Sequence, residues 1–197
     1  MQVGDLTRSA AVADAAEDVL RGAPETFSLA GFSMGGIVAF EIMRRAPEQV
    51  ERLALLSVNA GGSTPENFAA WRGWEAQARA GDLGNVLCTL SGWLHPAHRD
   101  TLAPTVEAMG ERVGKEAFLR QLDLLRSRTD SRPDLVRIRC PTLLVAGRDD
   151  RVTPVAAHEE MARALPDATL MVLGCGHYSP LEQPEAVSSA LRGWLEG

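Results

Sequence analysis

The chain has 197 residues, 45% of them hydrophobic and 23% charged, which is the composition of an ordinary globular protein with a sizeable core. Its net charge of −6, without a Lys/Arg cluster, argues against nucleic acid or an anionic membrane as a partner. No apolar run is long enough to span a membrane, and the N-terminus has no signal-peptide core.

Three cysteines, an odd number that no motif pairs, favour a reducing cytoplasm over a disulfide framework; they are Cys88, Cys140 and Cys175. Phosphate-binding and dinucleotide-binding glycine motifs are absent, so no cofactor is implied.

Short apolar segments predict four strands, at residues 27–30, 52–57, 142–146 and 169–173. Apolar residues at helical spacing alternate with these strands and predict helices at residues 10–20, 37–45 and 155–165. Strands that alternate with helices are typical of an α/β fold with a mostly parallel sheet.

Residues 62–131 differ from the rest because they contain helically spaced apolar residues and no β-branched run. We expect about four short helices here, inserted as a cap into a core made of residues 1–61 and 132–197. Three of the four tryptophans lie in this insertion. Its apolar side chains either form the insertion's own core or line a pocket that excludes water.

The strongest motif is Gly31-Phe32-Ser33-Met34-Gly35, a G-x-S-x-G pattern between a predicted strand and a predicted helix. A sharp strand-to-helix turn exposes a serine hydroxyl, and flanking glycines relieve the crowding that such a turn causes. Gly36 is expected to let the helix pack closely on the strand. Taken alone, the motif could also be a glycine-rich turn without chemistry.

A serine nucleophile needs a base, and the base needs an acid that orients it. A carboxylate pair, Asp149 and Asp150, follows the third predicted strand, and His177 follows the fourth. The serine, the carboxylates and the histidine all come after carboxyl ends of strands, which gather at one edge of a parallel sheet.

Other polar residues near these positions have simpler interpretations. Thr153 is expected to cap the helix that begins at Pro154, and His158 is expected on the solvated side of that helix. His95 and His98 could face one metal, but no carboxylate pattern accompanies them, so a surface turn is favoured and no metal site is predicted. Cys175 is expected to be a buried thiol.

In combination, these motifs make nearly the whole chain, from about Asp5 to Leu195, resemble the α/β-hydrolase superfamily. The resemblance is greatest to its small esterase, lactonase and C–C hydrolase branch. It implies that Ser33 is the nucleophile, that His177 is the general base, and that the backbone N–H of Met34 is one donor to the oxyanion. It selects Asp150 as the acid, with Asp149 as the alternative.

Complete members of this superfamily have three or four strands before the nucleophile, whereas only 32 residues precede Ser33 here. We therefore expect the fold to be N-terminally truncated by about a quarter of a domain of roughly 250 residues. The strand at 27–30 is then an exposed sheet edge, which favours self-association.

Two functional hypotheses follow. The first is a serine hydrolase that cleaves a small apolar ester, lactone or related acyl substrate through an acyl-enzyme. The second is a catalytically impaired remnant, with half of its oxyanion site, that acts as a ligand-binding or interaction protein.

Overall fold

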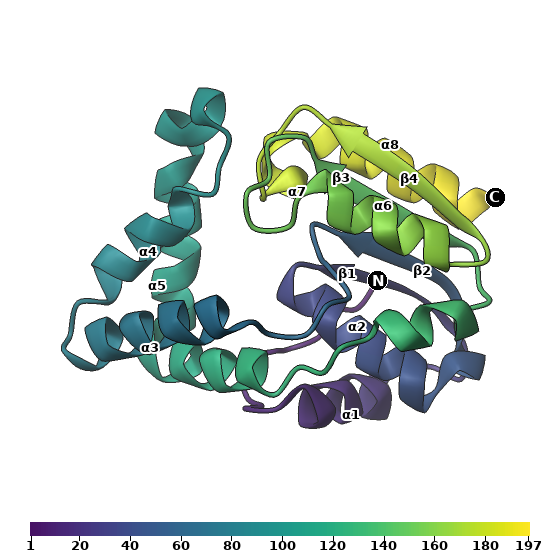
Figure 1. The fold of residues 1–197 in the computed structure, drawn as a ribbon, viewed down its shortest axis with the longest axis horizontal. Coiled ribbons are helices and arrows are strands. Elements are labelled where there is room, and N and C mark those ends of the chain that lie inside the picture. Colours follow the sequence, from purple (N-terminus) through teal and green to yellow (C-terminus); the bar gives the residue numbers. More distant parts are fainter.

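A computed structural model describes all residues 1–197. Four parallel strands form one sheet in the spatial order β1-β2-β3-β4, as Figure 1 shows. The strands are β1 (Phe27–Phe32), β2 (Val50–Leu56), β3 (Thr142–Gly147) and β4 (Ala168–Leu173). Because each connection returns the chain to the same end, all four carboxyl ends lie along one edge.

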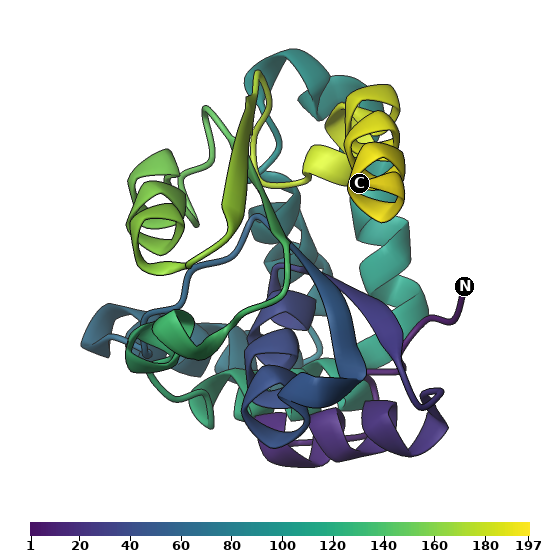
Figure 2. The same ribbon diagram turned by 90° about the vertical axis from the view of Figure 1, so that its right-hand side faces the viewer.

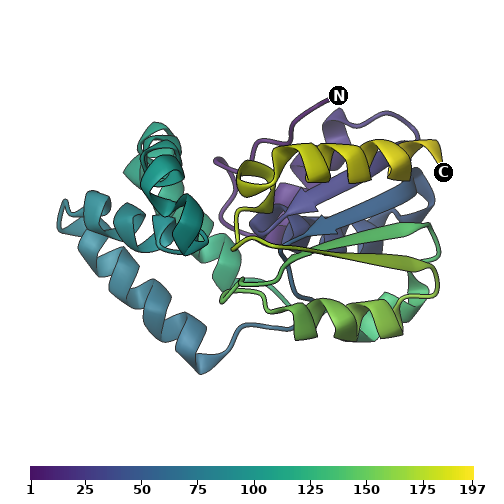
Figure 3. The same cartoon turned by 90° about the horizontal axis from the view of Figure 1, so that it is seen from above.

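Helices cover both faces of the sheet (Figure 3). The strands alternate with α1 (Val12–Gly22), α2 (Met34–Arg45) and α6 (Val155–Ala164), and the chain ends with α7 (Ser179–Glu182) and α8 (Pro184–Glu196). Two short 3-10 helices, Pro47–Gln49 and Arg132–Arg137, precede β2 and β3. Apolar residues of α2 and α6 share one buried cluster with alternate residues of the strands, and α1 packs on α2. The other face of the sheet packs on α8.

All four predicted strands are present, with ends shifted by one or two residues, and the parallel α/β arrangement is confirmed. The first strand continues through Gly31 and Phe32, and α2 begins directly after Ser33 instead of at Ile37. The pattern analysis did not predict α7 or α8. The helical spacing of Ala186, Val187, Ala190, Leu191 and Trp194 was the available signal for α8, whereas α7 is only four residues long and too short for a pattern.

Between β2 and β3 the chain forms α3 (Pro65–Arg79), α4 (Leu83–Ser91) and α5 (Pro96–Arg126), which we call the inserted helices. They project to one side of the sheet (Figure 1). Gly114, with φ of 77°, breaks α5 into two helical parts. Their apolar side chains mostly pack on one another, around Trp71, Phe118 and Leu122. Packing within the insertion is thus the main role of these residues.

Arg128 joins the two connections that lead into and out of the inserted helices. Its guanidinium donates hydrogen bonds to the backbone oxygens of Asn59 and Gly61, while Ser131 N–H donates to Ala60 O at 2.7 Å. These bonds hold the outgoing and returning segments side by side, which fixes the base of the insertion on the sheet.

The outer edge of β1 pairs with no strand. Ser28 and Ala30 are exposed, and the N-terminal residues Met1 to Leu6 run beside the strand across a groove of about 1070 Å³. Figure 2 shows β1 at the margin of the sheet, on the side where the N-terminus lies. No helix combines the length and the apolar character that crossing a bilayer requires.

Candidate active site

Ser33 occupies the turn between β1 and α2. Its φ of 49° and ψ of −113° are unusual for a residue with a side chain, and such strain is typical of functional sites. Its N–H still donates to Leu56 O at 2.9 Å, which extends the β1–β2 ladder to the serine itself. Strand β1 is therefore hydrogen-bonded to β2 up to the residue at which the turn begins.

The glycines around Ser33 have different roles. A Cβ on Gly31 would lie 2.6 Å from Gly35 O, and one on Gly36 would lie 2.8 Å from the Val58 side chain. A Cβ on Gly35 would meet nothing within 4 Å. Close packing thus requires Gly31 and Gly36. A Cβ on Gly31 of the strand would also lie 2.7 Å from Gly36 Cα, so Gly36 packs closely on the strand as expected and approaches the segment after β2 as well.

The structure brings together Ser33, His177 and Asp150. Ser33 Oγ lies 2.9 Å from His177 Nε2, and His177 Nδ1 lies 2.8 Å from Asp150 Oδ2. An ionised carboxylate can only accept, so Nδ1 carries the proton and Nε2 is free to accept from the serine hydroxyl. This tautomer is the one that a general base for Ser33 needs.

Asp150 is buried, and burial alone would raise its pKa, but hydrogen bonds lower the pKa below its ordinary value. The main contributions come from His177 and from Thr153. The hydroxyl of Thr153 donates to Oδ2 at 2.6 Å, and the N–H groups of Val152 and Thr153 donate to Oδ1 at 2.8 and 3.0 Å. The carboxylate is therefore kept ionised beside the imidazole.

This geometry corrects the expectation for Thr153, which holds Asp150 and does not cap α6. Asp149, the alternative acid, is half exposed, and its carboxylate lies 3.6 Å from His95 Nε2. Asp150, and not Asp149, contacts the imidazole of His177.

His177 lies in the histidine loop, residues 174–178, between the sheet and the inserted helices. A Cβ on Gly176 would come within 2.5 Å of Trp93 O, and one on Gly147 would come within 2.1 Å of Gly176 O. The loop therefore makes backbone contact with its neighbours on two sides. The indole of Trp93 stands edge-on to the imidazole, with ring centres 5.4 Å apart, and the ring of Phe32 lies 5.5 Å away.

The expectation that His158 is solvated was wrong, because its side chain is completely buried beneath the site. Its Nε2 lies 3.3 Å from the N–H of Val58, and its Nδ1 lies 3.3 Å from Pro154 O. Desolvation lowers the pKa of His158, so the neutral ring is favoured, with the proton on Nδ1. The ring supports the segment against which Gly36 packs.

The remaining residues considered from the sequence are Cys175, His95 and His98. Cys175 is buried as expected, and desolvation raises the pKa of its thiol to about 12. No group of three or more metal-ligating side chains occurs. His95 and His98 do not form a free surface turn, because His98 Nδ1 contacts the buried Glu182. Sequence analysis missed Glu182, and a carboxylate so close to His177 in the chain was the available signal.

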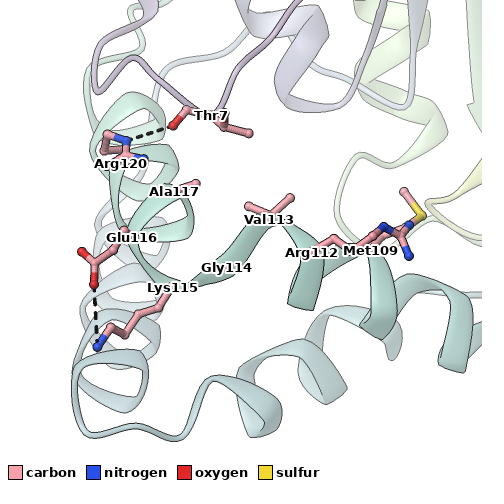
Figure 4. A pocket seen from close by; sticks show the side chains of 9 residues that line it. All are labelled: Thr7, Met109, Arg112, Val113, Gly114, Lys115, Glu116, Ala117 and Arg120. Carbon is pink, nitrogen blue, oxygen red and sulfur yellow. Dashed lines mark hydrogen bonds and ion pairs between the residues drawn. The ribbon is translucent and has the colours of Figure 1, made fainter.

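A hollow of about 720 Å³ at the break in α5 is separate from these residues (Figure 4). It is lined by Thr7 and by the two parts of α5 on either side of Gly114, with Arg120 donating to Thr7 O. It contains none of Ser33, Asp150 and His177.

Met34 is the first residue of α2, where backbone N–H groups have no acceptor within the helix. The N–H groups of Gly36 and Ile37 donate to Ser33 O, so these two donors are satisfied within the turn. The residues before β1 form one helix, α1, and no strand.

The proteins that resemble this chain belong to one family of enzymes. The sequence profile of the family described as "Alpha/beta hydrolase family" matches residues 3–190. The chain belongs to this family. It is an enzyme of the α/β-hydrolase fold.

Among curated relatives, the pimeloyl-[acyl-carrier protein] methyl ester esterase of Aromatoleum aromaticum is 33% identical over 88% of this chain and 76% of its own length. The 3-oxoadipate enol-lactonase 2 of Acinetobacter baylyi is 27% identical over 84% of this chain and 62% of its own length. Among solved structures, a thermophilic esterase from Thermogutta terrifontis has a TM-score of 0.87 and 26% identity, covering 100% of this chain and 75% of that one.

We predict that Gly36→Ala destabilises the fold while Gly35→Ala does not. The added methyl at 36 would overlap Val58, and overpacking typically costs about 1–3 kcal/mol. The methyl at 35 enters open space, and replacing a helical glycine is worth up to about 1 kcal/mol. Urea unfolding of both variants measures the difference, and equal midpoints would contradict the packing assignment.

We predict that Asp150 makes the fold sensitive to acid. Because its pKa is lowered from 3.8 in the folded state, the ionised carboxylate contributes stability that is complete above pH 3.8 and is lost as the pH falls through the lower, folded value. Asp150→Asn should flatten the pH dependence of the unfolding free energy in that range. Asp149, the exposed neighbour of Asp150, provides the control. Asp149→Asn should retain the wild-type pH dependence of the unfolding free energy.

Proposed function

We propose that the protein is a cytoplasmic serine hydrolase that cleaves small apolar esters, lactones or related acyl compounds through an acyl-enzyme. The observation that carries this proposal is the continuous hydrogen-bonded series from Ser33 through His177 to Asp150. Membership of the α/β-hydrolase family supports it, as do an esterase and an enol-lactonase among the relatives.

In the proposed mechanism, His177 Nε2 takes the proton of Ser33 as Oγ attacks the acyl carbon. Asp150 holds the proton on Nδ1 and stabilises the imidazolium that forms. The imidazolium then protonates the leaving oxygen, and the Ser33 ester is hydrolysed by a water that His177 deprotonates. The N–H of Met34 donates a hydrogen bond to the oxyanion, and the positive end of the α2 dipole also stabilises this negative charge.

The surroundings of His177 favour an apolar substrate. Trp93 and Phe32 contact the imidazole, and the ring of Tyr178 lies 5.6 Å from it. The ring of Trp74 lies tilted beside that of Trp93, with ring centres 5.8 Å apart. Aromatic faces bind acyl chains and exclude water, whereas no cluster of cations is present to select a phosphate. We propose that residues 62–131 act as a cap, since Trp93 belongs to this segment.

A panel of p-nitrophenyl esters of increasing chain length tests the proposal. We expect hydrolysis of short to medium acyl chains, lost in Ser33→Ala, and reduced by about 10³–10⁴ in Asp150→Asn because the wrong tautomer is favoured. Equal rates for Ser33→Ala and the wild type would contradict the nucleophile assignment.

Labelling by a fluorophosphonate tests the nucleophile separately from turnover. Labelling of the wild type but not of Ser33→Ala is expected for an activated serine. Labelling without ester turnover would support the impaired remnant instead. One oxyanion donor is worth roughly 10²–10³ in rate, so a site with only Met34 could acylate and still turn over poorly.

We further propose that two copies associate through the free edge of β1. The edge carries unpaired backbone groups, and Ser28 and Ala30 beside it are exposed. Sedimentation at increasing concentration should show a dimer, and Ala30→Lys, which places a charge at the edge, should shift the protein toward monomer. A wild-type monomer at every concentration would contradict this proposal.

A further inference from the structure

Glu182 is a buried carboxylate that the proposed mechanism does not use. Its side chain has no exposed surface, although it stands at the end of the short helix α7. Carboxyl groups are rarely buried unless several hydrogen-bond partners satisfy them, so the partners of Glu182 indicate its role.

On one side, these partners are the backbone groups next to His177. Gly176 N–H donates to Oε2 and Tyr178 N–H donates to Oε1, both at 3.1 Å. The N–H between them, that of His177, donates to Trp93 O at 3.0 Å. Three consecutive N–H groups of the histidine loop are therefore fixed by two acceptors, and their geometry determines where the imidazole points.

On the other side, Glu182 bonds the inserted helices. His95 N–H donates to Oε2 at 2.8 Å, and His98 Nδ1 lies 3.0 Å from the same oxygen. Because a carboxylate only accepts, His98 donates through Nδ1. One oxygen thus joins the start of α5 to the residue that precedes His177.

A metal site does not account for this arrangement. The second imidazole, His95, turns its Nδ1 to the N–H of Ala97 and its Nε2 toward Asp149, away from Glu182. A purely structural carboxylate would stabilise the fold without influencing the reacting imidazole. Glu182 instead accepts hydrogen bonds from the residues on both sides of His177, which favours an effect of Glu182 on the orientation of the imidazole itself.

We propose that Glu182 is a positioning residue that holds His177 in line with Ser33 and makes this alignment depend on the seating of the inserted helices. The inference rests on the proposed function in so far as His177 is the base. When α5 is seated, His95 and His98 donate to Glu182 and the histidine loop is held from both sides. When α5 moves away, two of the four donors are lost.

The test compares Glu182→Gln with Glu185→Gln, an exposed carboxylate three residues further on. The amide of Glu182→Gln keeps the shape but turns an N–H₂ group toward one set of donors. We expect kcat for a p-nitrophenyl ester to fall about 10- to 100-fold, the effect of a small misalignment, with KM changed less than about threefold. Glu185→Gln should match the wild type.

A spectroscopic measurement separates this proposal from the proposed function. The proton shared by His177 Nδ1 and Asp150 gives a far-downfield NMR resonance, which requires no substrate. We expect Glu182→Gln to shift or broaden it, even if the protein hydrolyses no ester tested. If Glu182→Gln lowers the stability of the protein but leaves both the resonance and kcat unchanged, the positioning role is overturned.

The link to α5 is tested at His98, whose side chain is 31% exposed, so that its variants should fold even if Glu182→Gln does not. His98→Ala should lower kcat about two- to tenfold, and His98→Asn, whose amide nitrogen can replace Nδ1 as the donor, should restore it. In the Glu182→Gln background, His98→Ala should have little further effect. Additive effects of the two changes, or no rescue by asparagine, would overturn the proposed link.

Discussion

The backbone turn at Ser33 is the constraint on which the other features depend. A serine in this conformation is strained, so it persists only where the surroundings fix both sides of the turn. The strand side is fixed by the bond from Ser33 N–H to Leu56 O, and the helix side by the contact of Gly36 with Val58. Val58 is in turn fixed by the buried ring of His158. Ser57, one residue earlier, also has a positive φ, so the strain extends to the end of the neighbouring strand.

Three of the buried titratable side chains around the site have different sets of hydrogen-bond partners. Asp150 accepts bonds from Thr153, Val152 and His177, so its charge is retained. His158 has only the Val58 N–H and a carbonyl as partners, so its neutral form is favoured. Glu182 receives four donors from two parts of the chain. For Asp150 and His158, burial penalises the charged form, and hydrogen bonds outweigh that penalty only for Asp150.

The sequence was sufficient for the parts of the site that follow strand ends. Apolar runs located the four strands, and the parallel order of those strands places the residues that follow them at one edge. The same reasoning failed for His158, because the periodicity of a ten-residue helix does not reveal that the segment after β2 covers its polar side. It failed for Thr153 because a threonine before a helix can either cap the helix or donate to a nearby carboxylate, and here its hydroxyl donates to Asp150. It missed Glu182 because three of its four donors are backbone N–H groups, which leave no pattern in side-chain identity.

The inserted helices contact both the sheet and the loop that carries His177. Their own core makes them a stable body, and Arg128 fixes their base to the segment after β2. At the far end they meet the histidine loop at Trp93, His95 and His98, where Gly176 leaves no space for a side chain. The imidazole is thus oriented by Asp150 from the sheet and by backbone bonds from the insertion. The insertion contacts the histidine loop directly, whereas the turn at Ser33 is held by the strand ladder and by the contact of Gly36 with Val58.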